Sequence, residues 1–150
     1  TILDKSGSCA LIALIINDTC YLVNLGDSRA LYSASCGRQL YQITRDHKPE
    51  DPIERKRIVQ NGGSVYKADF IDHDGFRYSL KNYNFGAGFE FPYRLLPGKL
   101  SVSRTFGDVS AKIPRLGGKP NVLISSPCIT IFKINQNSDF ILLGCKFFYY

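Results

Sequence analysis

The chain has 150 residues, 44% of them hydrophobic and 21% charged, and its 19 Lys and Arg against 13 Asp and Glu give a net charge of +6. This length and composition predict one compact domain and exclude an intrinsically disordered tail. The longest aliphatic run, Ala10 to Ile16, is far shorter than the ~20 residues of a membrane-spanning helix, and no basic segment leads into a cleavable signal sequence.

The first third of the chain is predicted to form an antiparallel meander of short strands. Apolar runs alternate there with turn residues such as Asn17-Asp18 and Gly26-Asp27-Ser28. We expect strands at residues 8–16, 20–25, 29–33 and 38–44.

One helix has clear start and stop signals. Asp51 is a suitable N-cap, Pro52 is favoured at the first helical position, and Glu54 occupies the capping-box position. Gly62-Gly63 can end the helix by adopting positive φ. These signals predict a helix from residue 52 to about residue 61.

The remainder of the chain is predicted to contain further strands around one irregular stretch. We expect strands at residues 64–68, 128–134 and 140–145. Residues 69–96 are crowded with glycine, asparagine and aromatic residues without a clean period, which is typical of a functional flap over a small satellite core. Many strands, one short helix and a flap together predict an α+β protein of layered sheets.

The five cysteines are scattered along the chain and include no CxxC pair. Four of them lie in or beside apolar runs, where a reduced cysteine behaves as a small hydrophobic residue. We therefore expect free thiols and an intracellular location, cytoplasmic or nuclear, rather than a disulfide framework or a zinc site.

Most of the positive charge lies in residues 94–120, where six basic residues stand against one acid and give a net charge of +5. Such a stretch can attract phosphate groups or an acidic partner, but a solvated loop is the favoured interpretation. No nucleic-acid-binding motif accompanies the charge, so we expect neither nucleic-acid nor membrane partners.

Four motif-like segments follow one another in order. They are SGSCA at residues 6–10, NLGDSRA at 24–30, TRDHKPEDPIE at 44–54 with NGG at 61–63, and LSVSRTFGD at 100–108. A GDSR tetrapeptide alone is uninformative, but four collinear segments and an apolar strand at 139–145 form a specific pattern. The set strongly resembles the metal-dependent protein serine/threonine phosphatases of the protein phosphatase 2C family, over nearly the whole chain.

The resemblance implies an αββα sandwich, in which two antiparallel β-sheets are flanked by helices. It also implies two Mg²⁺ or Mn²⁺ ions at one edge, which activate a water for attack on phosphoserine or phosphothreonine in phosphoprotein substrates. Hard oxygen ligands, mostly aspartate carboxylates, hold such ions.

Transferred to this sequence, the resemblance assigns few site residues. Asp27 matches the family's GDSR aspartate and is expected to lie beside the metal ions. Arg29, Arg104 and Asp108 match positions expected to support the site, and His47 of the DHKP turn is expected to be structural. A direct phosphate contact by Arg104 is the less favoured alternative, and no residue is assigned as catalytic.

Two departures predict that these 150 residues are inactive alone. The family's main metal-binding DG-H-G element precedes the SGS motif, whereas this chain opens on Thr1, without Met. After Cys145, where the family has Asp-Gly, Lys146 stands instead of a metal ligand. Its ammonium group opposes a metal ion by about 4 kcal/mol per unit charge at ~4 Å and an effective dielectric constant of ~20.

We therefore expect residues 1–150 to be the central part of one phosphatase-like domain, incomplete at both ends, with a flap at about 69–96. Three interpretations remain open for the chain. It is a piece of an active phosphatase, a catalytically dead pseudophosphatase that binds a regulatory protein partner, or a truncated gene product.

Overall fold

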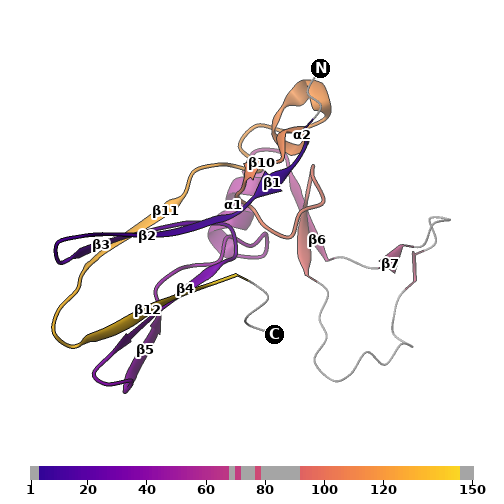
Figure 1. Cartoon of the computed structure of the whole chain (residues 1–150). Helices are drawn as coiled ribbons and strands as arrows, with labels where there is room; N and C mark the ends of the chain where they lie inside the picture. Colours follow the sequence, from indigo (N-terminus) through magenta and orange to yellow (C-terminus); the bar gives the residue numbers. More distant parts are fainter. Residues whose placement is uncertain (1–3, 68–69, 72–76, 79–91, 146–150) are drawn as a thin grey trace.

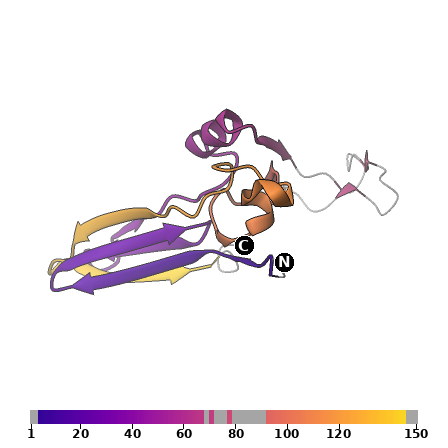
Figure 2. The same ribbon diagram turned by 90° about the horizontal axis from the view of Figure 1, so that it is seen from above.

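The computed structural model describes residues 4–67, 70–71, 77–78 and 92–145. Two three-stranded antiparallel sheets lie one above the other as the layers of a sandwich (Figure 1, Figure 2). The first sheet has the order β11-β3-β2, formed by Cys128–Lys133, Thr19–Leu25 and Ala10–Ile16. The second sheet has the order β12-β4-β5, formed by Ser138–Gly144, Arg29–Ala34 and Gln39–Gln42.

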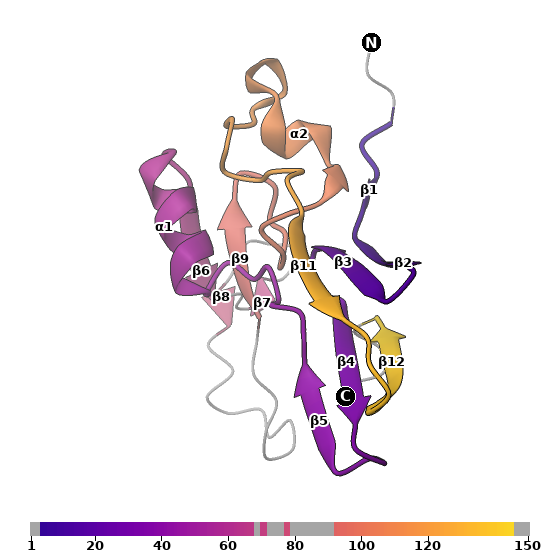
Figure 3. The ribbon, with the colours of Figure 1, turned by 90° about the vertical axis from the view of Figure 1, so that its left-hand side faces the viewer.

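The helices gather at one end of this sandwich (Figure 3). They are α1 (Pro52–Gln60), α2 (Val109–Lys112) and a 3₁₀ helix at Pro114–Leu116. Three short antiparallel pairs complete the described fold: β1 (Gly7–Ser8) with β10 (Phe106–Gly107), β6 (Ser64–Lys67) with β9 (Tyr93–Leu96), and β7 (Phe70–Ile71) with β8 (Arg77–Tyr78). Within the described ranges, no helix has the length and apolar character needed to cross a bilayer.

Every predicted strand is present, with bounds that differ by one or two residues. The first one, expected at 8–16, is divided at Cys9 into β1 and β2. The predicted flap at 69–96 lies largely outside the described residues, and its last four, Tyr93–Leu96, form β9 against β6.

The predicted single meander is wrong, because β3 and β4 belong to different sheets. Gly26 lies between these strands with φ of +115°, a conformation that residues with a side chain rarely adopt. The Cys9 sulfur also occupies the place where a Cβ on Gly26 would stand. The turn at 26–28 therefore carries the chain from one layer to the other, where β4 and β5 form a second hairpin.

Side chains from both sheets fill the space between the layers. On β3, Cys20 and Leu22 are buried, whereas the residues that alternate with them are partly exposed. Tyr32 of β4 meets Phe132 of β11 edge to face, with ring centroids 5.4 Å apart. This aromatic pair joins the two layers directly.

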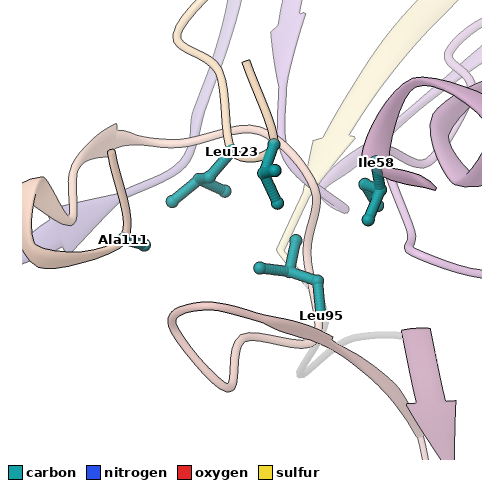
Figure 4. Packing of buried hydrophobic residues seen from close by; sticks show 5 residues of the cluster. Ile58, Leu95, Ala111 and Leu123 are labelled. Atoms are coloured by element: carbon teal, nitrogen blue, oxygen red, sulfur yellow. The ribbon is translucent and has the colours of Figure 1, made fainter. Parts of the chain in front are cut away.

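A hydrophobic cluster at the helical end of the molecule joins segments that are distant in the sequence (Figure 4). Its members come from α1, β9, α2 and the segment before β11, and they are Ile58, Leu95, Ala111, Val122 and Leu123. Each is at most 1% exposed. Segments that are far apart in the sequence are thus fixed relative to one another.

The start of α1 is as predicted, but the role of Glu54 is not. The Asp51 carboxylate accepts hydrogen bonds from the backbone N–H groups of Ile53 at 3.0 Å and Glu54 at 3.3 Å. Gly62 follows the helix with φ of +76°. The capping-box prediction is wrong, because the backbone N–H of Asp51 donates to the carbonyl of Lys48 at 3.1 Å while the Glu54 side chain is buried elsewhere.

The outward face of the β11-β3-β2 sheet is apolar. Alternation along the strands places Val23 and Tyr21 on this face, each flanked by an aliphatic residue on both neighbouring strands. Five residues on this side of the sheet are each 51–61% exposed, and together they define what we call the outer apolar face: Ile12, Leu14, Ile16, Ile129 and Ile131. An exposed apolar area of this kind favours association.

We predict that the 150-residue chain self-associates through the outer apolar face. Replacing Ile12, Ile129 and Ile131 together with Thr should shift the chain toward the monomer, because Thr keeps the preference for strands and removes apolar surface. Light scattering coupled to gel filtration measures this shift. The control is Val59→Thr on α1, which is 56% exposed outside the sheet and should change nothing. Unchanged association of the triple variant would contradict the assignment of this face.

Candidate functional site

The motif segments, which are far apart in the sequence, meet at the helical end of the sandwich (Figure 3). Pairing of β1 with β10 sets Gly7 opposite Gly107, so the SGS segment lies beside the end of the SRTFGD segment. His47 of the DHKP segment joins the GDSR and SRTFGD segments. Its backbone N–H donates to the carbonyl of Gly26 at 3.0 Å, and its carbonyl accepts from the N–H of Ser103 at 2.8 Å. The structure thus brings all four segments together.

Asp27 and Asp108 share one neighbourhood at this end. The pKa of the Cys9 thiol is raised, mainly by burial. The negative charges of Asp27 and Asp108 also raise it, whereas a backbone hydrogen bond from Asp27 opposes the shift. The Asp108 carboxylate also fills the place where a Cβ on Gly7 would stand. Two acidic residues singled out from the sequence therefore lie around the same thiol.

Asp108 is held there by its backbone. It adopts a left-handed conformation, with φ of 48°, at the start of α2, and its N–H donates to the carbonyl of Ser6 at 2.9 Å. Its side chain makes no cap hydrogen bond to α2. The carboxylate therefore lies against Gly7 and does not cap its own helix.

The donor set in the described ranges does not fit a complete two-metal centre. Such a centre needs several hard oxygen ligands for each ion. Residues 4–67 and 92–145, together with the two described pairs between them, contain no group of three or more His, Cys, Asp or Glu side chains arranged to hold a metal. Lys146, the position where the sequence loses an expected ligand, lies outside the described residues.

Arg29 binds a carboxylate from the DHKP segment. Its Nε and Nη2 donate to the two oxygens of Asp46 at 3.0 and 2.9 Å, and Lys48 lies 3.3 Å from the same carboxylate. An open depression of about 640 Å³ adjoins this pair. Its charged lining has three bases and three acids, namely Arg29, Arg45, Lys48, Asp46, Glu50 and Asp51. Because these formal charges balance, the depression has no net charge that attracts phosphate.

Arg104 is engaged by Glu54, which is only 2% exposed. The shortest contact joins Nη2 of Arg104 to Oε1 of Glu54 at 2.6 Å, and Nε of Arg104 lies 3.1 Å from Oε2. Arg57 and the hydroxyl of Ser103 donate to Oε2 at 2.6 and 2.5 Å. Burial alone would raise the pKa of Glu54, but hydrogen bonds from Arg104, Ser103 and Arg57 outweigh it and hold the pKa at about 2.

His47 is a buried, neutral residue in this structure. It is 1% exposed, and burial, followed by the positive charge of Arg104, lowers its pKa to about 4. Its Nδ1 accepts a hydrogen bond from the backbone N–H of Gly26 at 3.0 Å. The imidazole therefore fastens the DHKP segment to the GDSR turn.

The basic segment at 94–120 is not a simple solvated loop, because most of its basic side chains bind the chain itself. Arg94 donates to the carbonyl of Lys99 at 2.7 Å, Lys112 to the carbonyl of Thr105 at 2.7 Å, and Lys119 to the carbonyl of Gly62. With Arg104, four of the six basic side chains bind groups of the chain itself. Most of the charge excess therefore cross-links the helical end.

Two residues at this end, Glu54 and Cys128, were not predicted as site residues from the sequence. One signal for Glu54 was present, because it lies four residues before Ile58 and shares its buried helix face. Cys128, which lies beside His47 and Arg104, follows a proline and opens β11, and no local pattern marked it.

Comparison with known proteins agrees with this arrangement. The model of the protein phosphatase 2C family matches residues 2–149. The chain is 33% identical over 144 residues to protein phosphatase 1A of Bos taurus, covering 95% of this chain and 30% of that protein. It is 29% identical over 140 residues to probable protein phosphatase 2C 11 of Oryza sativa subsp. japonica, covering 93% of this chain and 31% of that protein. The chain thus spans about 30% of the length of these relatives.

Solved structures match the fold. A serine-threonine phosphatase 2C from Toxoplasma gondii superimposes with a TM-score of 0.61 at 24% identity, over 90% of this chain and 40% of that one. A phosphatase from a pathogenic strain of Toxoplasma gondii gives a TM-score of 0.56 at 30% identity, over 85% of this chain and 31% of that one.

The expected αββα sandwich is confirmed in part. The two facing antiparallel sheets are present, but in the described residues the helices lie at one end and the outer sheet faces are exposed (Figure 1). The fold is a partial protein phosphatase 2C fold, mostly β with few helices. With a family model that matches nearly every residue, the chain belongs to the protein phosphatase 2C family.

Proposed function

We propose that this chain is part of a Mg²⁺- or Mn²⁺-dependent protein serine/threonine phosphatase and that, taken alone, it builds the edge of the site without hydrolysing phosphoproteins. One observation carries the proposal. The Cys9 sulfur packs against Gly26, next to Asp27, and the Asp108 carboxylate packs against Gly7, yet the described residues gather no group of three or more possible metal ligands.

In this proposal the other site residues act as supports. Arg29 ties the strand after the GDSR turn to Asp46, and Arg104 ties the SRTFGD segment to Glu54 in α1. Both guanidinium groups have carboxylate partners, which supports a structural role over a direct phosphate contact. Asp27 is the residue proposed to lie nearest a metal ion.

We predict that the 150-residue chain does not hydrolyse a phosphothreonine peptide in millimolar Mn²⁺ above the rate of a buffer control. The physical reason is that two nearby carboxylates provide too few oxygen ligands to hold two ions and their activated water. Phosphate release measures the rate, with a complete member of the family as the positive control. Turnover that Asp27→Asn abolishes would contradict the proposal.

A second candidate is a pseudophosphatase that binds a regulatory partner without chemistry. It is favoured by Lys146, which stands where the family has an aspartate after Cys145. The nucleotide sequence around Cys145 separates the two candidates. A reading frame that continues with Asp-Gly after Cys145 supports the active phosphatase. A confirmed lysine codon at position 146, in the frame of a complete gene, supports the pseudophosphatase.

A further inference from the structure

Cys128 opens β11 at an exposed position, and two N–H groups contact its sulfur. Nε2 of His47 lies 3.2 Å from Sγ, and Nη1 of Arg104 lies 3.5 Å from it. Because Nδ1 of His47 accepts from the N–H of Gly26, the proton of the neutral imidazole is on Nε2 and is donated to the sulfur.

Arg104 is fixed beside this sulfur. Its Nε and Nη2 bind the Glu54 carboxylate, and its Nη1 also donates to the carbonyl of Ser126 at 3.0 Å. A guanidinium group held against an exposed cysteine sulfur gives the electropositive surroundings that are typical of reactive cysteines. Exposure and these two donors together make Cys128 a candidate reactive thiol.

A buried acceptor without a donor belongs to the residue paired with Cys128 on the neighbouring strand. Asn24 is the partner of Cys128 across β3 and β11, so both side chains project from the inner face of the sheet. Asn24 is 2% exposed, and its Nδ2 donates to the carbonyls of Arg45 at 3.0 Å and Gly26 at 3.4 Å. Its Oδ1 has no hydrogen-bond partner among the described residues. A hydroxyl group added to Cys128 would supply the donor that this oxygen lacks.

We propose that Cys128 is an oxidation site, at which hydrogen peroxide converts the thiolate to a sulfenic acid whose hydroxyl donates to Oδ1 of Asn24. The sulfur attacks one peroxide oxygen, so that an S–O bond forms as the O–O bond breaks. The sulfur loses two electrons, and the leaving hydroxide takes a proton from solvent and becomes water. The added oxygen displaces His47 from the sulfur and loosens its hydrogen bond to Gly26, which precedes Asp27.

The other cysteines provide comparisons within the same molecule. Burial raises the pKa of Cys9 and Cys20, which disfavours their thiolates. Cys36 is exposed like Cys128, but within the described part of the chain its sulfur accepts no recorded hydrogen bond. Cys36 is therefore the matched control for exposure without donors.

The test is dimedone labelling of the 150-residue chain in substoichiometric hydrogen peroxide at pH 7, quantified at each cysteine by mass spectrometry. We expect Cys128 to be labelled roughly tenfold faster than Cys36. The variant Cys128→Ser should remove the dominant label and leave the label on Cys36 unchanged. Equal or slower labelling of Cys128 relative to Cys36 would overturn the assignment.

A second measurement tests the link to the GDSR turn. Amide hydrogen exchange at Gly26 should be faster in the oxidised chain than in the reduced chain, because its acceptor on His47 is displaced. Peroxide-treated Cys128→Ser should exchange at the rate of the untreated variant. If Cys128 is oxidised and exchange at Gly26 is unchanged, the link between this thiol and the turn is refuted.

Discussion

Replacing Glu54 with Ala is expected to lower the free energy of unfolding by about 3–5 kcal/mol. The substitution removes the carboxylate that pairs with Arg104 and Arg57 and leaves the Arg104 side chain, which is 14% exposed, without its counter-charge. The hydroxyl of Ser103 loses its acceptor as well. Urea unfolding followed by circular dichroism measures the change, at low micromolar concentration and in the triple threonine variant of the outer apolar face.

Two variants make this prediction specific. Asp18 pairs with Lys133 at 2.7 Å, but both side chains are more than 60% exposed, so Asp18→Ala should leave the urea midpoint unchanged. Glu54→Gln should remove the loss of stability that we expect between pH ~4.5 and ~2. The folded pKa of Glu54, about 2, lies below its unfolded value, so its contribution is lost as the pH falls through this window. Equal effects of Glu54→Ala and Asp18→Ala would contradict the role of Glu54.

The chain is expected to lose about 3 kcal/mol of stability through His47 as the pH falls from 6.5 to 4. The unfolded chain binds a proton at His47 below pH 6.5, whereas burial and Arg104 keep the folded imidazole neutral down to about pH 4. The unfolded state therefore holds more protons in this window, and stability falls with pH. Each tenfold change in proton affinity corresponds to about 1.4 kcal/mol.

Urea midpoints measured from pH 6.5 to 5.5 isolate this effect from most carboxylates. In His47→Gln the slope in this range should be close to zero, although the variant is less stable throughout because the hydrogen bond to Gly26 is altered. An identical slope in the two proteins would assign the acid sensitivity to other groups.

Local signals predicted α1 and the strands of the two sandwich sheets well, but they did not indicate β10, α2 or the 3₁₀ helix. The cap at Asp51, Pro52 at the helix start and Gly62 after its end act through neighbouring backbone groups, so they can be recognised within a few residues. Strand positions followed from short apolar runs between turns for the same reason.

Features that depend on distant residues could not be predicted in this way. Glu54 resembled a capping-box residue because its strongest partner, Arg104, lies fifty positions later in the chain. The meander failed because φ at Gly26 directs the chain to the other sheet, and alternation of apolar residues carries no information on that choice. That the four motif segments lie together could be expected only from the family resemblance, because no local rule pairs Gly7 with Gly107.

We propose that Asp27 and Asp108 lie at one shared edge and form an incomplete metal site there. Titration of the ¹⁵N-labelled triple threonine variant with Mn²⁺ tests it most directly, because the ion broadens amide signals near its binding place. We predict that signals at residues 26–28 and 107–109 broaden together and only at millimolar Mn²⁺, and that Asp27→Asn weakens both effects. Broadening of the two segments at different Mn²⁺ concentrations would contradict the shared edge, and saturation at equimolar Mn²⁺ would contradict an incomplete site.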